Sequence, residues 1–206
     1  MRTKLLIVIL LVVLAGAATF GWLGYRLFTT GFSAKTEPQA IEIFMARQIR
    51  HLAIPIEQRN SLNPVPLSPD LLQEGLAHFA DHCAVCHAND GSGQTPIGKN
   101  VYPKAPDLRL PDTQSMSDGE LFWVIHNGIR FTAMPAWGEG DPAQDLDSWK
   151  LVHFLRHLPQ LTAEELDQMK ALNPKTKKDL EKEAAFDQFL QGNDSAAIQP
   201  ESGHHH

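Results

Sequence analysis

Cysteine is scarce in this chain of 206 residues: the only two are Cys83 and Cys86, and His87 follows directly. A disulfide scaffold needs more cysteines than this. We therefore expect the pair to have a local chemical role.

Basic side chains are scarce in the part of the chain beyond residue 67. Residues 68–160 carry 6 basic and 12 acidic side chains, residues 161–206 carry 5 and 9, and the whole chain has a formal net charge of −6. Nucleic-acid binding needs a basic footprint, so nucleic acid is not an expected partner. The acidic excess favours protein partners with basic docking surfaces, an attraction that salt weakens.

Charge is absent from residues 5–25, which follow Arg2 and Lys4. As a helix, these 21 residues reach about 30 Å, the thickness of a bilayer's hydrocarbon core. This predicts a membrane anchor over residues 1–30. A cleaved signal peptide is the alternative, because residues 5–14 make a short apolar region and Ala-Gly-Ala at 15–17 resembles a cleavage site.

The anchor is favoured because the apolar pattern continues through Phe20, Trp22 and Tyr25, beyond the length of an ordinary signal region. The basic residues before the run favour a cytoplasmic N-terminus. Both interpretations place the remainder of the chain on the exported side, periplasmic or extracellular.

Helical spacing of apolar residues and recognisable helix ends predict an all-α fold. The expected helices cover about 38–51, 69–83, 118–127, 147–158, 163–172 and 177–191. The expected N-caps are Thr36, Ser68, Ser117 and Thr162. Beyond the anchor we expect an amphipathic helix and a Pro-rich linker (31–67), a compact domain (68–160), and a helical extension with a disordered tail (161–206).

Residues 83–87, Cys-Ala-Val-Cys-His, fit the C-x-x-C-H pattern of covalent haem attachment. Two thiols at this spacing can each bond one vinyl group of the same porphyrin edge, and the histidine then lies under the iron. A C-x-x-C redox pair is expected near a βαβ pattern, and a zinc site needs four ligands, neither of which the sequence offers. One covalent haem c is therefore the expected cofactor. It would give the long loop at 89–113 something to wrap around.

The sixth iron ligand has four candidates: Met116, Met134, Met169 and His126. Met134 lies in a loop segment, Thr-Ala-Met-Pro-Ala-Trp, which presents a thioether without helical constraint. Met116 and Met169 suit core packing better. A surface position or a hydrogen bond is the expected role of His126.

The motifs follow an order that resembles a monohaem class I c-type cytochrome. They are Gly75 and Phe79, the 83–87 motif, Pro106-Asp107-Leu108, Gly128, Met134-Pro135-Ala136-Trp137 and the helix 149–158. The resemblance covers residues 68–160 and implies a small cytochrome c fold around one covalent haem. It also implies that the first and last helices of this domain cross near Gly75.

The resemblance further implies roles for individual side chains. His87 and Met134 would be the axial ligands, and Trp137 would donate its indole N–H to a haem propionate. The carbonyl of Pro106 would accept from the Nδ1–H of His87, with Pro103 as the alternative acceptor.

Two histidine patterns are weaker signals. His153 and His157, four residues apart on a helix, suit either a metal or a solvated helix face. The three histidines at 204–206 suit either a metal-binding tail or an appended tag.

We expect an exported, membrane-tethered electron carrier rather than an enzyme, because a His/Met pair fills both axial positions. One alternative is a cytochrome subunit of a larger oxidase or dehydrogenase, with 36–60 and 161–191 as docking elements. The other is a haem sensor or peroxidase in which Met134 leaves the iron easily.

Overall fold

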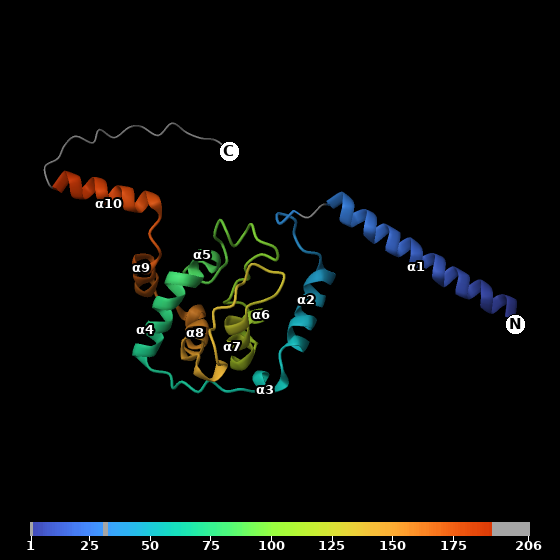
Figure 1. Ribbon diagram of the computed structural model, residues 1–206, viewed down its shortest axis with the longest axis horizontal. Coiled ribbons are helices and arrows are strands. Elements are labelled where there is room, and N and C mark those ends of the chain that lie inside the picture. Colours follow the sequence, from blue (N-terminus) through green and yellow to red (C-terminus); the bar gives the residue numbers. More distant parts are fainter. Residues whose placement is uncertain (1, 31–32, 191–206) are drawn as a thin grey trace.

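The computed structural model describes residues 2–30 and 33–190, and within them every regular element is a helix (Figure 1). The helices are α1 (Arg2–Thr30), α2 (Ala40–Ala53), α3 (Ile56–Arg59), α4 (Pro69–His78), α5 (Ala84–His87), α6 (Pro111–Gln114), α7 (Asp118–Asn127), α8 (Leu146–His157), α9 (Ala163–Leu172) and α10 (Lys177–Leu190). A π-helical turn, Phe79–Cys83, joins α4 to α5. The prediction of an all-α fold is confirmed.

Local side-chain hydrogen bonds set three of the helix starts. Ser68 accepts from the backbone N–H of Leu71 at the start of α4, and Ser117 accepts from that of Glu120 at the start of α7. Thr162 does the same for α9. Each bond satisfies a backbone donor that the first turn leaves free, so these three N-caps are confirmed. The N-cap expected at Thr36 is wrong, because α2 begins after Gln39.

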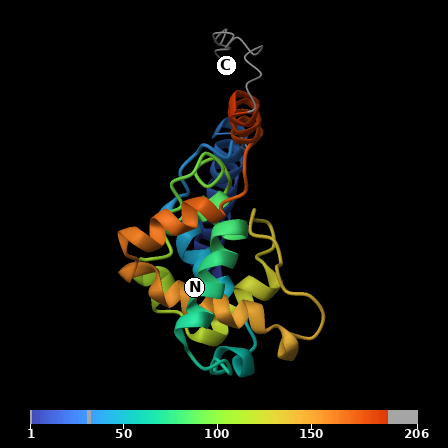
Figure 2. The same ribbon diagram turned by 90° about the vertical axis from the view of Figure 1, so that its left-hand side faces the viewer.

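Helices α4 and α8 lie against each other (Figure 1), and the two helices approach closely at Gly75. Figure 2 shows the same helices from the side. A Cβ at this position would lie 2.9 Å from the carbonyl oxygen of Lys150 and 3.0 Å from the Cβ of Phe154. Only glycine allows this approach without a shift of one helix. The helix crossing that the resemblance implies is confirmed.

Aromatic rings fill the core around this crossing. Phe79 and Phe154 lie with their ring centroids 5.1 Å apart, and Phe122 stacks on Trp149 at 4.2 Å. Phe79, Phe122 and Phe154 expose no more than 1% of their surface. Helices α4, α7 and α8 therefore share one apolar core.

The core extends beyond residue 160, where the sequence suggested that the compact domain ends. Met169 of α9 is fully buried in the same cluster, and α9 contacts α4 and the π-helical turn. Burial of its thioether packs α9 onto the domain, so part of the extension belongs to the core of this domain.

The Pro-rich segment lies along the domain rather than free of it. Asn63 donates to the carbonyl of Trp149, and a ring nitrogen of His153 lies 2.7 Å from the carbonyl oxygen of Val65. Ser117 also donates to the carbonyl of Arg59. A Cβ on Gly119 would lie 1.8 Å from the carbonyl oxygen of Gln58. Glycine at this position therefore leaves room for the backbone at Gln58 to lie against α7.

Helix α1 is long and apolar enough to cross a membrane, with a mean hydropathy of 2.6 over its most apolar window and no buried residue there. This confirms the apolar helix expected over 5–25. The same length and composition also suit a signal sequence, so the choice between the two stays a prediction. The expected disordered tail and the histidines at 204–206 lie outside the described residues.

Candidate functional site

The C-x-x-C-H motif begins at the end of the π-helical turn and continues through α5. No disulfide joins Cys83 and Cys86, and burial raises the pKa of the Cys83 thiol to about 12. Burial also raises the pKa of Cys86. Redox-active C-x-x-C pairs need a lowered thiol pKa, so the structure gives no support to that alternative.

A loop wraps closely around the backbone of the motif. Thr95 donates to the carbonyl of Cys86, and the N–H of Gly93 donates to the carbonyl of His87. A Cβ on Gly98 would lie 2.2 Å from the same Cys86 oxygen. The expected loop at 89–113 is thus ordered by contacts with the motif, with only the short helix α6 near its end.

The imidazole of His87 suits a ligand to iron. Burial lowers its pKa, and the nearby Pro106 carbonyl opposes that shift in part. Neutral imidazole is the form that binds metals. Its Nδ1 is buried and makes no hydrogen bond of normal geometry, a property that it shares among the described residues with Arg59 Nε. Buried polar atoms are nearly always paired, so this nitrogen still needs an acceptor.

Met134 lies half-buried in a compact loop that follows α7. Gly128 ends the helix with a φ of +65°, and the N–H of Ile129 donates to the carbonyl of Met134. The N–H of Met134 donates to Thr132 Oγ1. The N–H of Trp137 donates to the carbonyl of Ile125, and the N–H of Gly138 donates to that of His126, which returns the loop to α7.

The Trp137 ring links this methionine loop to the cysteine-bearing helix. Its centroid lies 5.3 Å from that of His82, which directly precedes Cys83, and the rings meet edge-on. His78 meets the other side of His82 at 4.9 Å. Sequence reasoning missed both histidines, although their spacing of four residues on a predicted helix was a usable signal.

The other candidate ligands are engaged elsewhere. Met169 is buried in the core, and Met116 packs against it. His126 is buried, with its Nδ1 2.6 Å from an oxygen of Asp145. The two methionines therefore have the packing role expected of them, and His126 has the expected hydrogen bond.

His153 and His157 have separate partners. His153 faces the Val65 carbonyl, and His157 lies 2.8 Å from Glu165. Within 2–30 and 33–190, no group of three or more His, Cys, Asp or Glu side chains is arranged to hold a metal. The two histidines connect α8 to neighbouring segments. They therefore form neither the metal site nor the fully solvated helix face that the sequence suggested.

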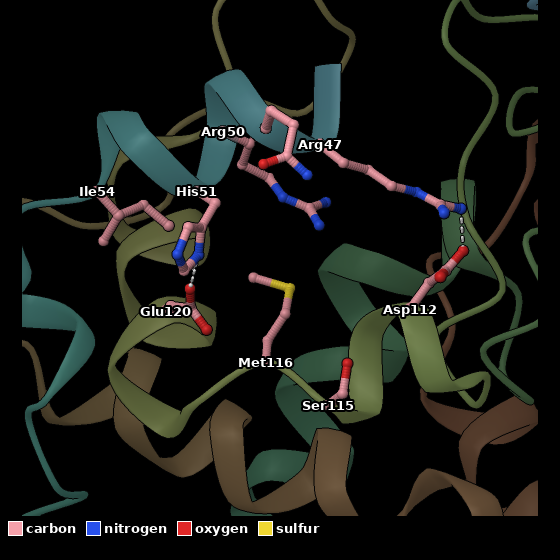
Figure 3. A pocket seen from close by; sticks show the side chains of 9 residues that line it. Arg47, Arg50, His51, Ile54, Asp112, Ser115, Met116 and Glu120 are labelled. Atoms are coloured by element: carbon pink, nitrogen blue, oxygen red, sulfur yellow. Dashed lines mark hydrogen bonds and ion pairs between the residues drawn. The ribbon is translucent and has the colours of Figure 1, made fainter. Parts of the chain in front are cut away.

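A pocket of about 300 Å³ lies between α2 and the segment that includes α6 and the start of α7 (Figure 3). Arg50, His51, Met116 and Glu120 are among its lining residues. None of the predicted haem-binding residues lines it. This pocket is therefore separate from the haem site that the motif predicts.

The residues around the motif fit a c-type haem, because two thiols and a neutral, unpaired imidazole follow the spacing that the group requires. Together with the helix crossing at Gly75, they give this part of the chain the features of a class I c-type cytochrome domain. Such domains carry haem c and transfer electrons to and from redox partners.

Residues 70–155 match the family described as Cytochrome C oxidase, cbb3-type, subunit III. A curated relative is a thiosulfate dehydrogenase of Stutzerimonas stutzeri (strain A1501), which is 30% identical over 94 residues. The aligned region covers 45% of this chain and 29% of that protein. The chain thus spans less than a third of the relative's length.

Proposed function

We propose that this protein is a membrane-tethered carrier of single electrons with one covalent haem. The observation that supports this best is the C-x-x-C-H motif, in which Cys83, Cys86 and His87 are partly buried and the buried Nδ1 of His87 still needs an acceptor. Cys83 and Cys86 would form the two thioether bonds. When bound, the haem cycles between the ferric and ferrous states.

His87 and Met134 are proposed as the axial ligands. Burial keeps the His87 imidazole neutral, and the nearby carbonyl of Pro106 is the proposed acceptor for its Nδ1–H. That hydrogen bond orients the ring and raises its basicity as a ligand. The compact loop presents Met134, and Trp137 is the proposed donor to a haem propionate.

With Met134 in the sixth position, the protein would be a carrier rather than a sensor or peroxidase. A thioether stabilises ferrous iron, which raises the reduction potential and leaves no open site for a substrate. The acidic excess of residues 68–160 supports redox partners with basic docking surfaces. Helix α1 supports a tether that holds the haem domain on the exported side.

Acid–acetone extraction tests the covalent haem. The colour is expected to stay with the protein in the wild type and to leave with the organic phase in a Cys83→Ser, Cys86→Ser double variant. Extraction of haem from the wild type would show that the haem is not covalently bound and that the proposal is wrong.

A subunit of a larger oxidase or dehydrogenase is the second candidate, favoured by the matched family and by the dehydrogenase relative. Size measurement of the protein solubilised gently from its native membranes separates the two functions. A lone carrier elutes as one chain in detergent, whereas a subunit elutes with other polypeptides.

A further inference from the structure

Helix α2 turns its polar side toward the haem domain. Arg47 forms an ion pair with Asp112, and Tyr102 donates a hydrogen bond to Glu42. His51 Nδ1 lies 2.8 Å from an oxygen of Glu120. In Figure 3, His51 points from α2 toward Glu120 across one end of the pocket.

The His51 contact is directional. Arg59 lies 2.6 Å from His51 Nε2, and a guanidinium only donates. Nε2 therefore accepts, and Nδ1–H donates to Glu120. This row of hydrogen bonds sets which side of α2 faces the domain.

The apolar stripe of α2, defined as Ile41, Met45, Ile49 and Leu52, lies on the opposite side. These four side chains expose 61%, 49%, 59% and 74% of their surface. No residue of α2 is buried. A helix of a soluble domain normally buries its apolar stripe and exposes its charges, so α2 has the reverse arrangement.

Chain length and position associate the stripe with the membrane. Only residues 31–39 separate α1 from α2, which at about 3.5 Å per residue places α2 within about 35 Å of the end of α1. Figure 1 shows α1 extending from the α2 side of the domain and running crosswise to α2. If α1 crosses a bilayer, α2 can lie along its surface.

The charge of this segment does not oppose a lipid surface. Residues 43–56 contain no acidic side chain, although residues 68–160 are acidic overall. Arg47 and Arg50 lie on the side of α2 that faces the domain, where Arg47 pairs with Asp112 and Arg50 lines the pocket. The apolar stripe can therefore approach anionic headgroups without bringing an acidic side chain of this segment toward them.

We propose that the apolar stripe of α2 lies in the interface of the bilayer that α1 enters, so that α2 separates the haem domain from the lipid. This inference rests on the membrane tether of the proposed function. It adds that the tethered domain has a fixed side toward the membrane, whereas a flexible tether would let it rotate freely.

The test uses the full, haem-loaded chain in vesicles that contain anionic lipid. An environment-sensitive fluorophore is attached to a single new thiol in each of three variants: Leu14→Cys in α1, Ile49→Cys in the stripe and Glu164→Cys in α9. All three positions are exposed, so the fold should be kept. Figure 1 places α9 on the opposite side of the domain from α2.

Lipid-borne quenchers are expected to act several-fold more strongly at positions 14 and 49 than at position 164. If position 14 is quenched but position 49 stays open to an aqueous quencher, the tether is correct and the inference about α2 is wrong. If position 14 is not quenched, α1 does not lie in the bilayer, and both the membrane tether and the inference about α2 are wrong. Shielding of position 49 from both quenchers would mean that protein, a second copy or a partner, covers the stripe.

Discussion

The ring of His82 meets the ring of Trp137 edge-on, with centroids 5.3 Å apart. This contact joins the helix that delivers the two cysteines to the loop that carries Met134. Aromatic pairs in this geometry contribute about 0.5–1.5 kcal/mol beyond the area that they bury. The two proposed axial ligands are therefore held in segments that touch through these rings.

The first prediction concerns this contact. His82→Leu removes the edge-on pair, so the methionine loop should open more easily. The weak charge-transfer band of methionine bound to ferric iron should be lost at a lower urea concentration than in the wild type. His78→Leu is the matched control, because it removes the neighbouring ring but leaves the contact with Trp137. Equal effects of both variants would contradict the prediction.

The second prediction concerns the sixth ligand. Met134→Ala should remove the methionine-to-iron band, let carbon monoxide bind rapidly to the reduced protein and lower the reduction potential, because the soft thioether favours ferrous iron. Absorption spectra and a redox titration measure these changes. Met116→Ala should leave all three properties nearly unchanged, since Met116 packs against the core. Rapid carbon monoxide binding by the wild type would favour the sensor or peroxidase.

The third prediction concerns the helix crossing. Gly75→Ala places a methyl group against the Lys150 carbonyl and Phe154, so α4 and α8 must separate. We expect the free energy of unfolding to fall by about 1–3 kcal/mol. Urea denaturation followed by circular dichroism measures this loss. Gln73→Ala, at an exposed position of the same helix, should change it by less than about 0.5 kcal/mol.

The fourth prediction concerns acid stability. Burial raises the pKa of the Asp145 carboxyl, but hydrogen bonds from Ser148 and His126 outweigh it, so the pKa lies below its usual value. A carboxyl with a lowered folded-state pKa stabilises the fold above its unfolded pKa, about 3.9, and loses that contribution as the pH falls through the folded value.

Asp145→Asn should therefore lower the free energy of unfolding at pH 7 by about 1–3 kcal/mol and have less effect near pH 2. Denaturant titrations at both pH values measure the difference. Asp147→Asn, at an exposed position nearby, should show a smaller change at pH 7. A loss that is the same at both pH values would indicate that packing, rather than charge, is responsible.

Several features could be predicted because a few consecutive residues determine them. Cys83, Cys86 and His87, on which the predicted haem attachment rests, are spaced within about one helical turn. The N-caps Ser68 and Ser117 act on backbone groups three residues away. The apolar run of α1 is likewise a property of the local sequence, and so is the glycine end of α7 at Gly128.

Other features depended on the tertiary structure, because their partners are distant in sequence. Burial of Met169 brings α9 into the core, and the Trp137 ring reaches a histidine 55 residues earlier. The stripe of α2 was visible in the sequence, but its direction was not. A periodic pattern shows that a helix has two faces, whereas the partners of Arg47 and His51, more than 60 residues away, decide which face meets the domain.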